Sequence, residues 1–142
     1  MTRSGGEAPA VATPSGLPRA PRRSLVVLTC MDARIDPLSA FGLGLGDAHV
    51  LRNAGAAVTD DVLRSLSLSH AAAGTRELWL VGHTDCLAHG SSDERVEASL
   101  RRSIERIART GGAIASMRVR AFRYDLDSDR MTELRLPTDD EK

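Results

Sequence analysis

Two short apolar runs, each leading to side chains that can bind a metal, constrain the fold of this chain more than any other feature. Residues 25–28 (Leu-Val-Val-Leu) lead to Cys30, and residues 78–81 (Leu-Trp-Leu-Val) lead to His83 and Cys86. Continuous, partly β-branched runs of this length are typical of strands buried on both faces of a parallel sheet. Because sites assemble beyond the carboxyl ends of parallel strands, we expect Cys30, His83 and Cys86 to converge there.

Helical patterns separate the expected strands. A short helix is expected from Pro37 and a second one between Thr59, as its N-cap, and Gly74. A third is expected from Ser91, because Ser91 and Glu94 have the spacing of a capping box and apolar residues then recur at intervals of four and three. Strands and helices therefore alternate along the first two thirds of the chain, which favours βαβ units.

The strand pattern predicts the fold class. The expected strands are residues 24–30, 48–51, 77–82, 119–124 and 131–136. The turn expected between the last two is short enough for a hairpin, which makes the last strand antiparallel to its neighbour. The prediction is an α/β fold with a mostly parallel five-stranded sheet flanked by helices and an antiparallel last strand.

The length of the chain allows one domain. With 142 residues it is too short for two good hydrophobic cores. Residues 1–23 hold four of the six prolines and no periodic apolar pattern, so we expect a flexible N-terminal arm. Residues 24–136 would form a single zinc-binding domain, and residues 137–142 a frayed tail.

Composition excludes several classes of partner. A formal net charge of +0 offers no field that would attract nucleic acid. No run of residues is long and apolar enough to span a bilayer, and no signal-peptide pattern is present, so we expect neither a membrane nor a secretory route. The expected location is the reducing cytoplasm, where both cysteines stay free for a metal.

The residue types at the two strand ends suit zinc, which prefers tetrahedral nitrogen and sulfur ligands. His83 and Cys86 can chelate from one turn, and Cys30 arrives from the neighbouring strand. Three ligands of this type leave a fourth position open, as in catalytic zinc sites. The alternative is that the cysteines are small buried hydrophobic residues and His83 a hydrogen-bonded core histidine. The combination of both motifs favours one Zn²⁺ per chain.

Asp32 and Arg34 add a second group of candidate site residues. If the segment is extended, Cys30, Asp32 and Arg34 face one pocket, while Met31 and Ala33 turn to the core. A bidentate contact from Arg34 would keep Asp32 ionised and oriented. The alternative is an exposed ion pair that contributes little. Taken alone, these residues predict zinc hydroxide acting on a small electrophile.

Three motifs, residues 30–34, 46–55 and 82–86, resemble in sequence and order those of the β-class carbonic anhydrases. The resemblance is dense over residues 24–86 and loose over the last strands. It implies a mostly parallel sheet with helices on both sides and the reversible hydration of CO₂ to bicarbonate and a proton. It also implies a homodimer or a dimer of dimers, with the sites near the subunit interface.

The resemblance also implies a role for each site residue. Cys30, His83 and Cys86 would bind the zinc ion, and Asp32 and Arg34 would form the catalytic dyad that orients zinc-bound hydroxide. In some members of the family the carboxylate that matches Asp32 instead coordinates the zinc in a closed state. Two other functions stay open: hydrolysis of a related small electrophile, such as carbonyl sulfide or carbon disulfide, and zinc binding without catalysis.

The sequence departs from the family in three places. Leu87 follows the second cysteine, where the family has glycine. The region between Cys86 and the last strands is shorter than usual. A proline-rich arm takes the place of the N-terminal helices that embrace the partner subunit. These departures bear on the pocket and on the dimer, and they leave the three ligand positions unchanged. His89 could be a substitute ligand or proton carrier, or a histidine of a surface turn.

Overall fold

The structure, a computed structural model, describes residues 16–135. The elements in chain order are β1 (Leu25–Cys30), α1 (Pro37–Ala40), β2 (Ala48–Asn53), α2 (Asp60–Ala73), β3 (Glu77–His83), the 3₁₀-helix η1 (Leu87–His89), α3 (Asp93–Thr110), α4 (Gly112–Ala115), β4 (Arg118–Asp125) and β5 (Arg130–Leu134). Residues 1–15 of the predicted arm and the whole predicted tail lie outside the described residues.

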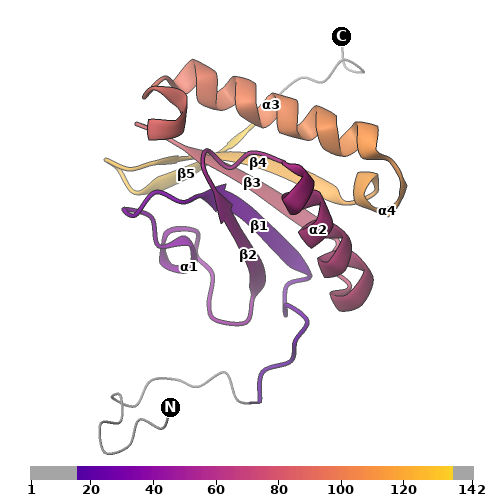
Figure 1. Ribbon diagram of the computed structural model, residues 1–142. Coiled ribbons are helices and arrows are strands. Elements are labelled where there is room, and N and C mark those ends of the chain that lie inside the picture. The colour runs from indigo at the N-terminus through magenta and orange to yellow at the C-terminus, as the bar shows by residue number, and fades with distance from the viewer. Residues whose placement is uncertain (1–15, 136–142) are drawn as a thin grey trace, which may run out of the picture.

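The five strands form one sheet in the order β2-β1-β3-β4-β5, which Figure 1 shows with α2 and α3 packed along it. β1 pairs in parallel with β2 and β3, β3 pairs in parallel with β4, and β5 is antiparallel to β4. All six residues of β1 are buried, as expected for a central strand covered on both faces. The predicted fold class is therefore confirmed.

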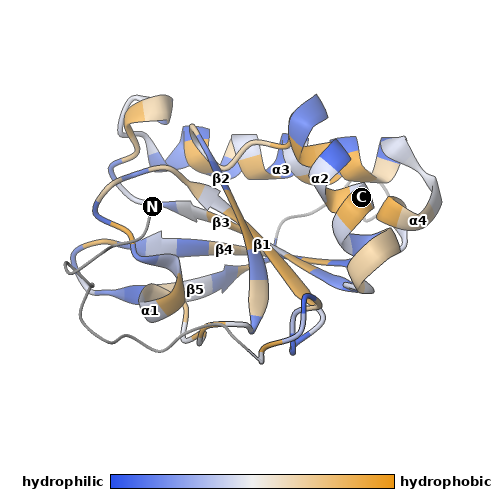
Figure 2. Ribbon diagram, turned by 60° about the horizontal axis from the view of Figure 1, so that its bottom comes forward, coloured by the Kyte–Doolittle hydropathy of each residue, from blue (hydrophilic) through white to orange (hydrophobic). Residues whose placement is uncertain are grey.

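Alternate residues of the central strands enter two separate cores, because successive side chains of a strand point to opposite faces. Val26 and Leu28 of β1 pack with residues of α2, α3 and α4. Leu25 and Val27 pack on the other face, with Trp79 of β3 and partly buried residues of α1. Figure 2 shows the same division, with α2 and α3 on one side of the sheet and α1 on the other. Within the described residues, no helix combines the length and apolar character that a membrane span needs.

The start of α3 differs from the prediction by one residue. Ser92, and not Ser91, is the N-cap: its side chain accepts a hydrogen bond from the backbone N–H of Arg95 at 3.2 Å. Ser91 instead donates its hydroxyl to the carboxylate of Asp85 at 2.8 Å. The predicted capping box of Ser91 and Glu94 is wrong because the Ser91 side chain is used by a contact with Asp85 in the preceding loop.

Part of the predicted N-terminal arm is bound to the domain. The backbone N–H groups of Arg22 and Arg23 donate to the carbonyls of Gly46 and Asp47, at 2.9 and 3.1 Å. The guanidinium of Arg23 also lies 5.4 Å from the ring centroid of Trp79. Ordered contacts therefore begin before residue 24. The helices η1 and α4 were not predicted, and β5 ends two residues earlier than expected.

Candidate metal centre

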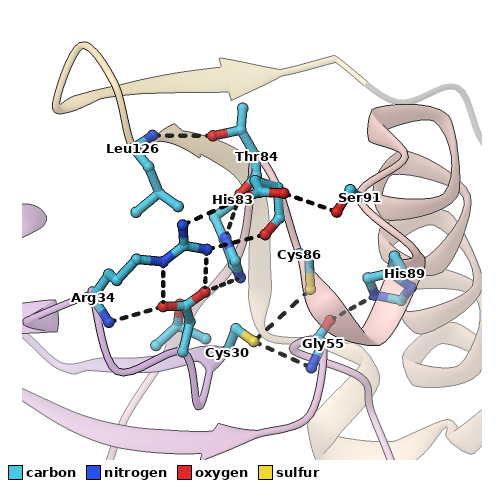
Figure 3. Close-up of polar contacts among 12 residues, drawn as sticks. Cys30, Arg34, Gly55, His83, Thr84, Cys86, His89, Ser91 and Leu126 are labelled. Carbon is cyan, nitrogen blue, oxygen red and sulfur yellow. Dashed lines mark hydrogen bonds and ion pairs between the residues drawn. The ribbon is translucent and has the colours of Figure 1, made fainter.

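The fold brings the three candidate ligands together at one end of the sheet. Cys30 is the last residue of β1 and His83 the last residue of β3, so the parallel pairing of these strands places both at the same edge. Cys86 follows three residues later, just before η1. The ligand atoms of the three residues lie within 4.8 Å of one another, and all three residues are buried (Figure 3).

The hydrogen bonds of His83 leave one ring nitrogen ready for a metal. Nδ1 lies 2.7 Å from the carbonyl oxygen of Thr84. A carbonyl can only accept, so Nδ1 carries the proton and Nε2 keeps its lone pair. Nε2 is buried and, within the described residues, has no hydrogen-bond partner. An unpartnered buried polar atom is costly, and a metal ion would satisfy it.

The two sulfur atoms are spaced as zinc requires. Sγ of Cys30 and Sγ of Cys86 lie 4.0 Å apart. Two thiolates on a tetrahedral zinc, with Zn–S near ~2.3 Å, would lie about 3.8 Å apart. Burial raises the pKa of the Cys86 thiol, so metal binding has to displace its proton. The donor set, the spacing and the orphaned Nε2 of His83 together fit a single Zn²⁺.

Asp32 and Arg34 form a bidentate pair beside these ligands. Nε of Arg34 donates to Oδ1 of Asp32 at 3.0 Å, and Nη2 donates to Oδ2 at 2.7 Å. The hydrogen bonds from the Arg34 side chain are the main reason why the pKa of Asp32 falls from 3.8 to about 2. Oδ2 of Asp32 lies 3.8 Å from Nε2 of His83. An ionised, oriented carboxylate therefore faces the space next to the three ligand atoms.

The predicted orientation of Met31 and Ala33 is wrong. Met31 is 64% exposed and Ala33 is also exposed, so neither side chain reaches the core. The segment is not extended, because the backbone N–H of Ile35 donates to the carbonyl of Asp32 at 3.1 Å and closes a turn. Ile35 enters the core instead and is 3% exposed. Met31 and Ala33 consequently line the pocket together with Asp32.

A pocket of about 550 Å³ opens beside the candidate ligand Cys30. Most of its side chains are apolar, and Leu87, at 94% exposure, stands at its rim. The lining residues are Cys30, Met31, Asp32, Ala33, Arg34, Ala54, Leu87 and Ala88. Such a lining suits a small, uncharged molecule.

Two residues that contact the Cys30 segment were not predicted as part of the site. Arg52 donates from Nε to the carbonyl of Cys30 at 2.9 Å and from Nη2 to the carbonyl of Asp32 at 2.7 Å. Gly55 donates its backbone N–H to Sγ of Cys30 at 3.4 Å. The sequence predicted that Gly55 takes a positive φ, and its φ is 80°. The sulfur contact depends on packing between β2 and β1 and left no local signal.

His89 belongs to neither the ligand group nor the pocket lining. Its Nε2 lies 3.3 Å from the carbonyl oxygen of Gly55, and the residue is half-buried. Within the described residues, the group that could hold a metal consists of Cys30, His83 and Cys86. The geometry therefore does not support His89 as a substitute ligand.

Comparison with known proteins places this architecture in a family. A family model described as "Carbonic anhydrase" matches residues 25–134, which include the three candidate ligands. Beta-carbonic anhydrase 1 of Mycobacterium tuberculosis is 51% identical over 70 residues, or 49% of this chain and 43% of that protein. The chain belongs to the β-carbonic anhydrase family. The crystal structure of a carbonic anhydrase from Streptococcus mutans matches over 89% of this chain and 88% of the Streptococcus chain, with a TM-score of 0.77 and 34% identity.

A relative with a different printed activity matches a similar share of this chain. A carbon disulfide hydrolase of Acidianus sp. (strain A1-3) is 49% identical over 71 residues, or 50% of this chain and 34% of that protein. The chain therefore spans less than half of the length of either curated relative. These matches establish the family of the chain.

Proposed function

We propose that this chain catalyses the reversible hydration of CO₂ to bicarbonate and a proton, with one Zn²⁺ held by Cys30, His83 and Cys86. The observation that carries the proposal is the convergence of three buried ligand atoms within 4.8 Å, beside the ionised carboxylate of Asp32. The three ligands leave one coordination position for a reacting water, and Asp32 and Arg34 would be the catalytic dyad next to it.

Held by Cys30, His83 and Cys86, a Zn²⁺ would supply the chemistry that the side chains lack, since zinc can lower the pKa of a bound water toward roughly 7. Asp32 would orient the reacting water. As an ionised carboxylate it can only accept a hydrogen bond, so it selects the orientation of the reacting water in which a proton points at Oδ2. Arg34 holds both carboxylate oxygens and prevents Asp32 from rotating.

The remaining pocket residues suit the substrate. CO₂ has no net dipole, and the alkyl groups of Met31, Ala54 and Leu87 offer it an apolar surface next to the ligand atoms. Arg34 also lines the pocket and carries the positive charge that the anionic product would meet on leaving.

The test is stopped-flow CO₂ hydration by the zinc-loaded protein. We expect activity well above the uncatalysed rate, a loss of at least about tenfold in Asp32→Ala, and loss of zinc and activity together in Cys86→Ser. Asp61→Ala, which removes an exposed carboxylate of α2, is the matched control and should behave like the wild type. Background rates in the wild type and Asp32→Ala alike would reject the proposal, and elemental analysis should find one zinc per chain.

Hydrolysis of carbon disulfide or carbonyl sulfide is the second candidate. It is supported by the similarity to the Acidianus carbon disulfide hydrolase and by the apolar pocket lining, since these substrates are also linear and uncharged. The same zinc-loaded samples should be incubated with carbon disulfide, and the release of sulfide measured. Sulfide release with no CO₂ hydration would replace the first proposal by the second. Zinc binding with neither activity would indicate a non-catalytic member of the family.

We also propose a homodimer or a dimer of dimers in the reducing cytoplasm. Met31 and Leu87 are 64% and 94% exposed beside the pocket, and a second subunit would cover such side chains. Both cysteines are free thiols, as that compartment requires. Light scattering coupled to size exclusion should give at least twice the mass of one chain, and a monomer at micromolar concentration would contradict the dimer.

A further inference from the structure

We propose that Asp85 and Ser91 are positioning residues, which hold the Arg34 guanidinium in the orientation that fixes Asp32. Their contacts in the structure assign this role. The inference rests on the proposed catalytic dyad, because it says how that dyad is kept in place. It concerns the side of Arg34 that faces away from Asp32.

The guanidinium of Arg34 lies between two carboxylates. One edge, formed by Nε and Nη2, donates to Asp32. Nη1 donates to Oδ2 of Asp85 at 3.1 Å, and Nη2 also donates to the backbone carbonyl of Asp85 at 3.1 Å. Arg34 thus joins the turn after β1 to the turn after β3, which are the two segments that carry the candidate ligands.

A second contact is needed because the first one is exposed. The Arg34 side chain is 53% exposed, and an exposed ion pair with one carboxylate holds a long side chain only weakly. Released from Asp85, Arg34 could leave Asp32 for solvent by changing its rotamer. Contacts on two sides leave one arrangement in which all of these donors are used.

Ser91 fixes Asp85 from the opposite side. Its hydroxyl donates to Oδ1 of Asp85 at 2.8 Å, so the two carboxylate oxygens of Asp85 have different partners, Ser91 and Arg34. The backbone conformation orients the side chains of Asp85 and Ser91. Asp85 and Ser91 both have positive φ, 53° and 59°, which is uncommon for residues other than glycine. The carbonyl of Cys86 accepts the backbone N–H groups of His89 and Ser91, at 3.0 and 2.9 Å, and closes the loop between them.

The contacts of Ser91 and Ser92 provide a matched pair of variants. Ser91 contacts Asp85, and Ser92 caps α3. Ser91→Gly removes the hydroxyl at a backbone position that glycine favours, so no strain is added. Ser92→Ala removes the helix cap and should lower the melting temperature without reaching Arg34. Asp85→Asn keeps the backbone contact to Arg34 and removes the charge.

The experiment combines two measurements on the zinc-loaded protein. The first is solvent exchange of the Arg34 Nε–H, followed by ¹H–¹⁵N NMR and assigned by its absence in Arg34→Lys. The second is kcat and KM for CO₂ hydration. In Ser91→Gly we expect exchange to be faster and kcat lower by about two- to tenfold, the effect of losing one hydrogen bond, with KM unchanged. In Asp85→Asn both effects should be larger, about tenfold.

Two outcomes would overturn the inference. One is wild-type exchange of the Arg34 Nε–H in both Ser91→Gly and Asp85→Asn. The other is a change of exchange rate and kcat in Ser92→Ala as large as in Ser91→Gly, which would mean that a general loss of stability causes the effect. The exchange measurement does not depend on turnover: if the wild type fails to hydrate CO₂, the proposed function fails, and the exchange rates still decide whether Asp85 and Ser91 hold Arg34.

Discussion

Gly82 lies directly before the candidate ligand His83 in β3, and its replacement by alanine tests how the fold positions the metal centre. A Cβ at this position would lie 2.5 Å from Cγ1 of Val96 in α3. Carbon atoms of packed side chains are normally about 3.5–4.0 Å apart, so the overlap is about 1 Å or more. β3 is paired with β1 on one side and β4 on the other, so α3 has to move instead.

The size of the effect follows from this overlap. Inserting one methyl group into a packed core costs about 1–3 kcal/mol of the free energy of unfolding. For a chain of this size each kcal/mol lowers the melting temperature by about 3–6 °C. Val96 is 1% exposed, and Val96→Ala alone should cost about 1.6 kcal/mol, from about 0.8 kcal/mol for each buried methyl group.

The double variant is the decisive measurement. In Gly82→Ala with Val96→Ala, the new methyl group fills the space that Val96 leaves, so the double variant should be more stable than the sum of the single effects by about 1–2 kcal/mol. Urea unfolding at 25 °C of the metal-free, reduced protein gives all four values. Gly44→Ala is the control, since its Cβ would meet nothing closer than 3.6 Å and its φ is not positive. Strict additivity, or wild-type stability of Gly82→Ala, would refute the reasoning.

Three further predictions concern the site. Gly55→Ala should lower the free energy of unfolding, measured by urea unfolding, by about 1–3 kcal/mol. Gly55 has a φ of 80°, and the Cβ of an alanine there would lie 2.6 Å from Nε2 of His89. Zinc affinity should fall by at least about tenfold per unit of pH between about pH 8 and 6, because burial raises the pKa of the Cys86 thiol and its proton competes with the metal. Competition with a chromophoric chelator measures the affinity. An affinity that does not depend on pH would contradict thiolate binding. The pKa of Asp32 is about 2 in the folded protein and 3.8 without its partners, so its stabilising contribution is complete above 3.8 and is lost as the pH falls toward about 2. In Asp32→Asn the free energy of unfolding, measured by urea titration, should therefore fall less steeply than in the wild type as the pH drops from 3.8 toward about 2. The same pH dependence in both proteins would argue against the contact with Arg34.

The parts of the fold that sequence could predict are those set by local pattern. β1 and β3 are continuous apolar runs, and a strand buried on both faces needs no more than that. Once they are adjacent and parallel, their carboxyl ends coincide, so the convergence of Cys30, His83 and Cys86 follows from topology. The bidentate contact between Asp32 and Arg34 was also predictable, because two residues that close in sequence can meet in almost any turn.

The features that sequence could not predict are choices between alternative conformations of the loops that follow β1 and β3. Ser91 and Ser92 are equally good helix caps, and the choice between them is set by Asp85 in the preceding loop. Met31 is exposed because the turn closed by Ile35 replaces the expected extended segment. In each case two local conformations are similar in free energy, and a tertiary hydrogen bond or a buried side chain decides between them.

The site divides into a rigid part and an exposed part, and this division has consequences for mutation. Cys30, His83 and Cys86 are buried and end or follow central strands, so their spacing is held by the same core that stabilises the sheet. Arg34 lies on a turn at the surface with its side chain 53% exposed, and hydrogen bonds with Asp32 and Asp85 orient it. Substitutions in the core should therefore alter metal affinity and stability together, whereas substitutions around Arg34 should alter turnover while metal affinity is retained.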